Sequence, residues 1–252
     1  YLYYQKKLKD ENRVDYADML LQGKNYIENK NIKFLIVDEF QDISPLRAEV
    51  IKEIQNKNKD VQLFVVGDDW QSIYRFSGGD IDIIVSKFKE YFGKATIKEL
   101  GLTYRFNQKL CELTSSFIQK NPKQLKKNIT GMGSFNKIPV EIYRQKNHSN
   151  FRIDFSLKKK LLENLDEIFQ NDKNVKTILF LSRYREFNYS NGYEDLKKYL
   201  NNIFKIKKNL FKFSTIHKAK GAEADYVFIL NISDGHLGFP STIEDDPLLK
   251  LA

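Results

Sequence analysis

Two pairs of acidic residues follow apolar runs, and their types suit metal and phosphate chemistry. Asp38 and Glu39 come directly after FLIV, and Asp68 and Asp69 come directly after VQLFVVG. Mg²⁺ prefers one or two carboxylates together with water and phosphate oxygens, and a neighbouring carboxylate can orient or deprotonate an attacking water. The pattern favours Asp38 as a metal ligand and Glu39 as the activator of a water. Acids also end strands simply because turns are polar, so both interpretations stay open.

The residues after the second acidic pair, QSIYRFSGGD, add an amide and two aromatic rings. The amide of Gln71 could contact a terminal phosphate or hold a water. Tyr74 and Phe76 are two residues apart, so in an extended segment both rings would point the same way. With Arg75 between them they could form a stacking platform for unpaired bases, at about 1–3 kcal/mol per base. Aromatic side chains are more often part of a hydrophobic core, which is the competing interpretation.

The elements that would position these residues alternate between strand and helix. The apolar run before Asp38 is short, unalternating and rich in large side chains, which predicts a strand buried on both faces. Pro45, preceded by Ser44, marks the start of a helix. A strand–helix–strand–helix order is typical of a parallel sheet covered by helices, where ligands bind outside the carboxyl ends of the strands.

Two such series follow one another along the chain. In the first we expect helices in residues 14–27, 45–55 and 107–119, and strands in 34–38, 61–66 and 94–100. In the second, after a polar stretch at 121–139 that resembles a linker or a surface excursion, we expect strands in 139–144, 175–183, 211–216 and 224–231, and helices in 156–170 and 193–204. The sequence therefore predicts an α/β fold with two domains in tandem, residues 1–95 and 96–252.

Composition limits the class of protein. The chain has 252 residues, of which 41% are hydrophobic, so it can bury a core. A net charge of +9 favours a nucleic-acid partner only weakly, since a Lys- and Asn-rich bias gives the same charge. The single cysteine, Cys111, excludes an internal disulfide and fits a reducing compartment such as the cytoplasm. No apolar run approaches the ~20 residues of a membrane span, so we expect no membrane partner.

Four segments, in this order, resemble motifs of one helicase family. They are DEFQD at 38–42, GDDWQSIYRFSGGD at 67–80, LTYRFN at 102–107 and STIHKAKGAEADYVFIL at 214–230. They look like motifs II, III, IV and V of superfamily 1 DNA helicases of the UvrD/Rep/PcrA type, helicase IV-like branch. The resemblance covers essentially the whole chain. It implies two RecA-like parallel-sheet lobes in tandem, and an ATP-dependent 3′→5′ helicase or translocase acting on single-stranded or partly duplex DNA, in pathways such as DNA repair.

The resemblance also implies a role for each matching residue. Asp38 would bind Mg²⁺, Glu39 would activate the water, and Gln71 would contact the γ-phosphate of ATP. Arg105 would reach the same phosphate from the second domain, because a planar guanidinium can bind two phosphate oxygens. The further implied contacts are Tyr104, Gly221 and Glu223 with the nucleotide, and Tyr74, Phe76 and His217 with DNA.

The sequence departs from the family pattern in three places. Ser77 stands where the family commonly has an Arg that touches DNA, no GxxxxGK[ST] sequence is found, and the chain stops soon after motif V. We therefore expect the first lobe to be incomplete, lacking its P-loop strand, and the chain alone to lack ATPase activity. An exposed sheet edge and apolar surface in that lobe would favour self-association.

Two other functions fit part of the sequence. One is a helicase-like nucleic-acid-binding protein without ATPase activity, although such a protein would have no reason to keep Asp38, Glu39, Gln71 and Arg105. The other is a metal nuclease that uses the acidic residues Asp38, Asp42, Asp68 and Asp69.

Overall fold

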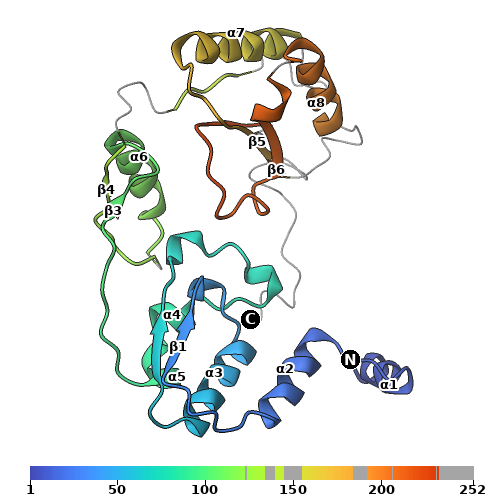
Figure 1. The fold of residues 1–252 in the computed structure, drawn as a ribbon, viewed down its shortest axis with the longest axis vertical. Coiled ribbons are helices and arrows are strands. Elements are labelled where there is room, and N and C mark those ends of the chain that lie inside the picture. The colour runs from blue at the N-terminus through green and yellow to red at the C-terminus, as the bar shows by residue number, and fades with distance from the viewer. Residues whose placement is uncertain are drawn as a thin grey trace. The chain divides into compact units, whose positions relative to one another are not determined.

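The computed structural model describes residues 1–122, 124–133, 140–144, 155–183, 192–205, 207–230 and 232. The chain divides into two compact units, one within residues 1–135 and one within residues 136–246. Each unit is a mixture of helices and small parallel sheets (Figure 1), so the α/β class expected from the sequence is confirmed. Residues 96–135 group with the first unit. The domain limits 1–95 and 96–252 stay a prediction.

The first unit holds two small sheets and six helices among its described residues. The strands are β1 (Phe34–Val37), β2 (Gln62–Val65), β3 (Leu102–Thr103) and β4 (Thr130–Gly131). The helices are α1 (Leu2–Asp10), α2 (Tyr16–Asn25), α3 (Pro45–Lys57), α4 (Asp82–Val85), α5 (Phe88–Phe92) and α6 (Gln108–Ile118). Three short 3₁₀ turns are η1 (Phe40–Asp42), η2 (Asp69–Gln71) and η3 (Arg75–Ser77). β1 pairs in parallel with β2, and β3 pairs in parallel with β4.

Polar side chains fix the helix starts and the approach to β1. Asp15 caps α2 by accepting a hydrogen bond of 2.8 Å from the backbone N–H of Asp18. Ser44 caps α3 and Pro45 occupies the first turn, as predicted. The buried side chain of Asn58 accepts hydrogen bonds from the backbone N–H groups of Lys30 and Ile32, both at 3.1 Å. One amide therefore ties the segment before β1 to the end of α3.

The first sheet buries only one of its faces among the described residues. Side chains of Leu35, Val37, Leu63 and Val65 pack against a core formed by Phe40, Ile43, Ala48, Ile51 and Ile83. Figure 1 shows the helices of that core, α3, α4 and α5, beside β1. On the other face Phe34 is 67% exposed and Ile36 is 69% exposed. The prediction of a strand buried on both faces is therefore wrong, because α3, α4 and α5 cover a single face.

Three further predictions for short segments are wrong. Residues 94–100 form no strand, and Ile97 and Leu100 are exposed, because no strand of the described chain pairs with them. Residues 140–144 are also irregular. The stretch at 121–133, expected to be a linker or a surface excursion, is not a linker, because it contains β4 and packs against the second acidic pair. The rest of that stretch and the start of the expected strand at 139 lie outside the described residues.

The second unit has a three-stranded parallel sheet with strand order β6–β5–β7. Its elements are α7 (Phe155–Asn171), β5 (Ile178–Ser182), α8 (Gly192–Ile203), η4 (Lys208–Leu210), β6 (Phe211–Thr215) and β7 (Tyr226–Ile229). The helices predicted at 156–170 and 193–204 and the strands predicted at 175–183, 211–216 and 224–231 are thus confirmed, whereas the strand predicted at 139–144 is not. The central strand is the most buried, and Phe180 stacks against Phe213 at 4.9 Å and Phe228 at 5.1 Å between ring centroids. Across the part of the chain that the structure describes, no helix has the length and apolarity needed to cross a bilayer.

Candidate functional site

The ends of β1 and β2 meet at one edge of the first sheet. The two strands are parallel, with Val37 opposite Val65. Their backbones stay joined beyond the strands: the N–H of Val66 donates to the carbonyl of Val37, and the N–H of Phe40 donates to the carbonyl of Val66, both at 2.9 Å. The two acidic sequences therefore begin side by side, at the sheet edge where parallel α/β proteins bind ligands.

Gln41 joins these two sequences through its side chain. It is 0% exposed, its Nε2 donates to Oε2 of Glu39 at 2.5 Å, and its Oε1 accepts from the backbone N–H of Asp68 at 2.9 Å. An amide can serve both ends because it carries a donor and an acceptor. Gln41 was not identified as a site residue from the sequence. The feature that could have indicated it is its position as the one uncharged polar residue in DEFQD, directly after the apolar Phe40.

The backbone is constrained where the chain leaves β1 and where it leaves β2. Glu39 has a φ of 50°, in the left-handed region that costs a non-glycine residue about 1–2 kcal/mol. Its N–H donates to Oδ1 of Asp38 at 2.8 Å, which supports that turn. A Cβ at Gly67 would lie 2.9 Å from Oε1 of Gln41, so glycine is needed where the chain passes this amide. The turn after β1 and the close approach after β2 thus hold the two acidic pairs in place.

Asp68 orients Gln71. Oδ2 of Asp68 accepts from Nε2 of Gln71 at 2.7 Å, and Oδ1 accepts from the backbone N–H of Trp70 at 3.2 Å and from Lys127 at 2.6 Å. Burial raises the pKa of Asp68 and is the largest single influence. The hydrogen bonds from Lys127 and Gln71 outweigh it, so the pKa lies below its ordinary value. Asp68 is therefore a charged carboxylate near neutral pH.

Asp69 is a buried partner of the same lysine. It is 1% exposed and forms an ion pair with Lys127. Its Oδ1 contacts the ammonium group without a well-aligned hydrogen bond, whereas Oδ2 accepts from the backbone N–H of Leu125 at 2.8 Å. We attribute the contact between Oδ1 of Asp69 and the ammonium group of Lys127 to charge attraction, because an ion pair needs less alignment than a hydrogen bond. Lys127 thus offsets part of the negative charge of the acids that follow β2.

The acids that follow β1 have different surroundings. Asp38 and Glu39 are exposed, and they line a cavity of about 320 Å³ that reaches Arg47 and Leu20. An exposed carboxylate beside a second one fits Mg²⁺, which takes its remaining ligands from water and phosphate. In the described part of the chain no group of three or more His, Cys, Asp or Glu side chains is placed to hold a metal. The nuclease hypothesis with Asp38, Asp42, Asp68 and Asp69 therefore gains no support.

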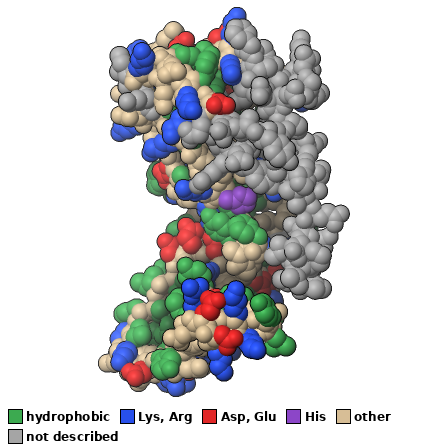
Figure 2. All heavy atoms as spheres, turned by 90° about the vertical axis from the view of Figure 1, so that its right-hand side faces the viewer, with side chains coloured by type: hydrophobic (Ala, Val, Ile, Leu, Met, Phe, Trp, Pro, Cys, Tyr) green, Lys and Arg blue, Asp and Glu red, His purple; other side chains and the backbone are tan. Residues whose placement is uncertain are grey.

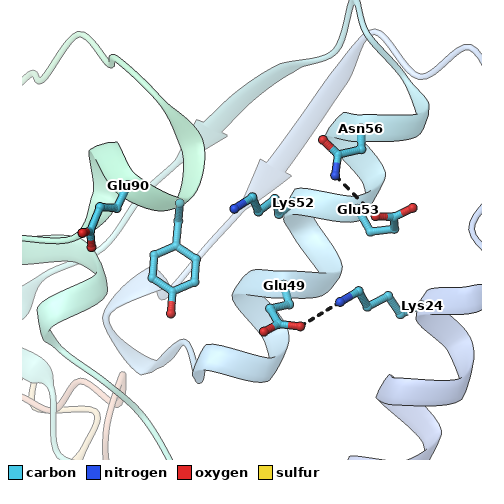
Figure 3. A pocket seen from close by; sticks show the side chains of 7 residues that line it. Lys24, Glu49, Lys52, Glu53, Asn56 and Glu90 are labelled. Carbon is cyan, nitrogen blue, oxygen red and sulfur yellow. Dashed lines mark hydrogen bonds and ion pairs between the residues drawn. The ribbon is translucent and has the colours of Figure 1, made fainter.

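A larger cavity of about 520 Å³ lies between α2, α3 and α5 (Figure 3). Two of its charged groups form an ion pair: Nζ of Lys24 donates to Oε2 of Glu49 at 2.7 Å, and this hydrogen bond is the main cause that lowers the pKa of Glu49. None of its lining residues comes from the ends of β1 or β2. The strand ends, where the two acidic sequences meet, are therefore the candidate site, and the larger cavity is not.

The two aromatic residues of the second motif lie on a turn. Phe76 belongs to η3, so the expectation of an extended segment is wrong. The rings of Tyr74 and Phe76 are nevertheless in contact, with centroids 5.9 Å apart at an angle of 72°. Gly78, with φ of 86°, ends the turn. Since Phe76 is 59% exposed, the pair presents an aromatic surface next to the loop of Gln71.

The other predicted site residues lie on two further loops. Tyr104 and Arg105 follow β3 in the first unit, both exposed, and the N–H of Arg105 donates to Oγ1 of Thr103 at 3.4 Å. His217, Gly221 and Glu223 lie between β6 and β7 in the second unit, and Gly221 has a φ of 77°. The structure thus brings Asp38, Glu39 and Gln71 into one network, with the other residues on separate loops.

Charge alone does not mark a binding surface. On the face drawn in Figure 2, Lys and Arg side chains lie among Asp and Glu side chains, and hydrophobic side chains also reach the surface. On this face the basic side chains are therefore interspersed with acidic ones, and the evidence for a ligand comes from the strand ends.

Comparison with known proteins identifies the family to which this chain belongs. The UvrD/REP helicase N-terminal domain matches residues 1–92, and the UvrD-like helicase C-terminal domain matches residues 84–249. The chain belongs to the UvrD/Rep family of helicases. The family resemblance of the four motifs is thus confirmed.

Individual relatives are DNA helicases. DNA helicase IV of Escherichia coli strain K12 is 36% identical over 94% of this chain and 32% of its own length. Putative ATP-dependent DNA helicase YjcD of Bacillus subtilis strain 168 is 27% identical over 57% of this chain and 20% of its own length. ATP-dependent DNA helicase PcrA of the same organism is 28% identical over 51% of this chain and 18% of its own length. The chain therefore spans about a third or less of the length of these relatives.

Proposed function

We propose that this chain is part of an ATP-dependent 3′→5′ DNA helicase or translocase that moves on single-stranded or partly duplex DNA. The observation that carries the proposal is the Gln41 bridge, which joins Glu39 at the end of β1 to Asp68 after β2. Family membership supports ATP and DNA as the ligands of this chain, because relatives such as PcrA are named ATP-dependent DNA helicases. The cytoplasm is the compartment that we propose for it.

The first set of residues would act on the phosphates. Bound Mg²⁺ would neutralise charge on the phosphate oxygens. Asp38 would hold the ion, and Glu39 would accept a proton from the attacking water. Gln41 donates to Oε2 of Glu39 at 2.5 Å, which fixes the direction of this carboxylate. Gln71, held by Asp68, would contact the γ-phosphate.

A second set would bind ATP from the other motor domain, which we place at residues 96–252. Tyr104 would pack on the adenine, Arg105 would bind the γ-phosphate through two parallel hydrogen bonds, and Gly221 and Glu223 would contact the nucleotide. ATP would draw the two RecA-like lobes together because both engage it, and hydrolysis would release them. Tyr74, Phe76 and His217 would contact DNA, so each cycle would move the aromatic pair along the bases.

The chain by itself is proposed to lack ATPase activity and to self-associate. The phosphates need backbone N–H groups and a lysine of the GxxxxGK[ST] type, which the sequence does not contain. The exposed face of β1 and β2 supports self-association.

The test is ATP turnover by the full gene product, read from its own start codon, with Mg²⁺ and single-stranded DNA. We expect turnover by the wild type and a loss of roughly 10²–10⁴-fold in Glu39→Gln, because the amide cannot accept the proton. Glu28→Gln is the matched control, since Glu28 is an exposed glutamate paired with Lys30 at 2.7 Å. DNA binding without turnover in the wild type would contradict the motor and favour a nucleic-acid-binding protein.

A further inference from the structure

The loop after β2 is held by a segment that comes more than fifty residues later. Leu125 and Lys127 lie between α6 and β4. The indole Nε1 of Trp70 donates to the carbonyl of Leu125 at 3.0 Å, and the N–H of Leu125 donates to Oδ2 of Asp69 at 2.8 Å. This reciprocal pair of contacts fixes the segment against η2.

Lys127 supplies the charge at the centre of this contact. Its ammonium group pairs with both Asp68 and Asp69, and it lies 5.2 Å from the centre of the Trp70 ring, within range of a cation–π interaction. Burial lowers the pKa of Lys127 and is the largest single influence. The interactions of Lys127 with Asp68 and Asp69 outweigh it, so the pKa is raised. A buried Asp69 without this cation would be costly.

The same contact reaches Gln71 through one carboxylate. Oδ1 of Asp68 binds Lys127 at 2.6 Å, while Oδ2 accepts from Nε2 of Gln71 at 2.7 Å. Since an ionised carboxylate only accepts, the end of Gln71 that faces Asp68 must be its NH₂ group. Lys127 therefore fixes the Asp68 carboxylate, and Asp68 fixes the direction of the Gln71 amide.

Lys127 also belongs to the substructure that carries Arg105. It lies three residues before β4, which pairs with β3, and Arg105 follows β3. We propose that Lys127 is a positioning residue for ATP hydrolysis, which orients Gln71 through Asp68 and ties the Gln71 loop to the Arg105 substructure. This inference rests on the proposed function of Gln71.

The contact can be tested on this chain without any activity, because Trp70 is its only tryptophan. Lys127→Met removes the ammonium group with little change in length. We expect a red shift of the Trp70 emission and a loss of protection from acrylamide. Lys126→Met, at the exposed neighbouring lysine, should leave both unchanged. Lys127→Arg, which keeps the charge, should restore the protection.

Circular dichroism separates this result from misfolding. If Lys127→Met fails to fold, Asp68→Asn provides the same test, because it removes one carboxylate while Lys127 keeps Asp69. A wild-type Trp70 emission in a folded Lys127→Met or Asp68→Asn variant would overturn the proposed contact.

The role in turnover is tested in the full gene product. We expect Lys127→Met to lower kcat by about 10- to 100-fold with little change in KM for ATP, as for a misplaced catalytic group. Lys127→Arg should recover most of the loss, and Lys126→Met should match the wild type. An unchanged kcat, or a rise in KM alone, would overturn the positioning role while the proposed function stands. Absence of turnover in the wild type would overturn both.

Discussion

The β1–β2 sheet of the first unit and the three-stranded sheet of the second unit are held together by different forces. In the second unit the central strand β5 is buried between α7 and α8 and the aromatic side chains of its neighbours. In the first unit β1 and β2 bury one face, and Phe64 is 60% exposed on the other. Besides its apolar core, the first unit is joined by polar side chains that link distant segments: Gln41, Asn58, Asp68 and Lys127.

The difference explains where chemistry can occur. An aromatic core fixes strands but offers no ligands, whereas a polar network at a sheet edge fixes the direction of individual carboxylates and amides. We therefore expect substitutions in the second unit to change stability most, and substitutions in the first unit to change the geometry of the site. Four predictions test this comparison, from the largest expected effect to the smallest.

The largest effect is expected for Phe180→Ala. Phe180 is 0% exposed and stacks on two other rings, so we expect its truncation to lower the free energy of unfolding by about 3–5 kcal/mol. Phe64→Ala, the matched residue on the exposed face of β2, should cost less than about 1 kcal/mol. Urea unfolding followed by circular dichroism measures both. Equal losses of unfolding free energy in Phe180→Ala and Phe64→Ala would contradict the difference between the two sheets.

Gln41→Leu should have the next largest effect. The substitution leaves the buried N–H of Asp68 without its acceptor, which costs about 1–3 kcal/mol. Gln62→Leu, at an exposed glutamine of β2, is the control. The same urea titration applies, and hydrogen exchange at the Asp68 amide should quicken only in Gln41→Leu. If Gln41→Leu were as stable as Gln62→Leu and its Asp68 amide still exchanged slowly, the Gln41 bridge would not be needed for stability.

The third prediction concerns the cap of α6. Oδ1 of Asn107 accepts from the backbone N–H of Leu110 at 2.9 Å, so Asn107→Ala should cost about 1 kcal/mol. Asn107→Asp, which keeps the acceptor, should stay close to the wild type in thermal unfolding. If both variants lose the same stability, the capping interaction is not the cause.

The smallest effect is a dependence on pH. The pKa of Asp68 is lowered from 3.8, so its contribution is present above pH 3.8 and is lost as the pH falls through the folded value below it. The pKa of Lys127 is raised from 10.5, so its contribution is present below pH 10.5 and is lost as the pH rises past the folded value. The coupling free energy of Asp68→Asn and Lys127→Met, measured by urea unfolding of both single variants and the double variant, should therefore be constant between these limits. A coupling free energy that changes between pH 5 and 9 would contradict the ion pair.

The sequence predicted the parts of the fold that depend on neighbouring residues. Ser44, Pro45 and Asn107 mark helix starts that the structure has, and both acidic pairs follow parallel strands as expected. The exposed face of β1 could not be predicted, because a run of apolar side chains does not reveal whether a second layer covers it.

The missed parts of the site depend on distant residues. Lys127 meets Asp68 across 59 positions, and no local pattern in a stretch that resembles a linker indicates such a partner. Gln41 reaches Asp68 across 27 positions through a single amide. The family resemblance identified the motifs that meet at the sheet edge, whereas the side chains that hold them together emerged only from the packing.

The most direct test of the account asks whether the loop after β2 links ATP hydrolysis to DNA. The measurement is the ratio of ATP turnover with and without single-stranded DNA in the full gene product. For Phe76→Ala we predict basal turnover close to the wild type and loss of most of the stimulation, because each stacked base contributes about 1–3 kcal/mol. Phe117→Ala, at another exposed phenylalanine, should keep the stimulation. Full stimulation in Phe76→Ala, or none in the wild type, would contradict the account.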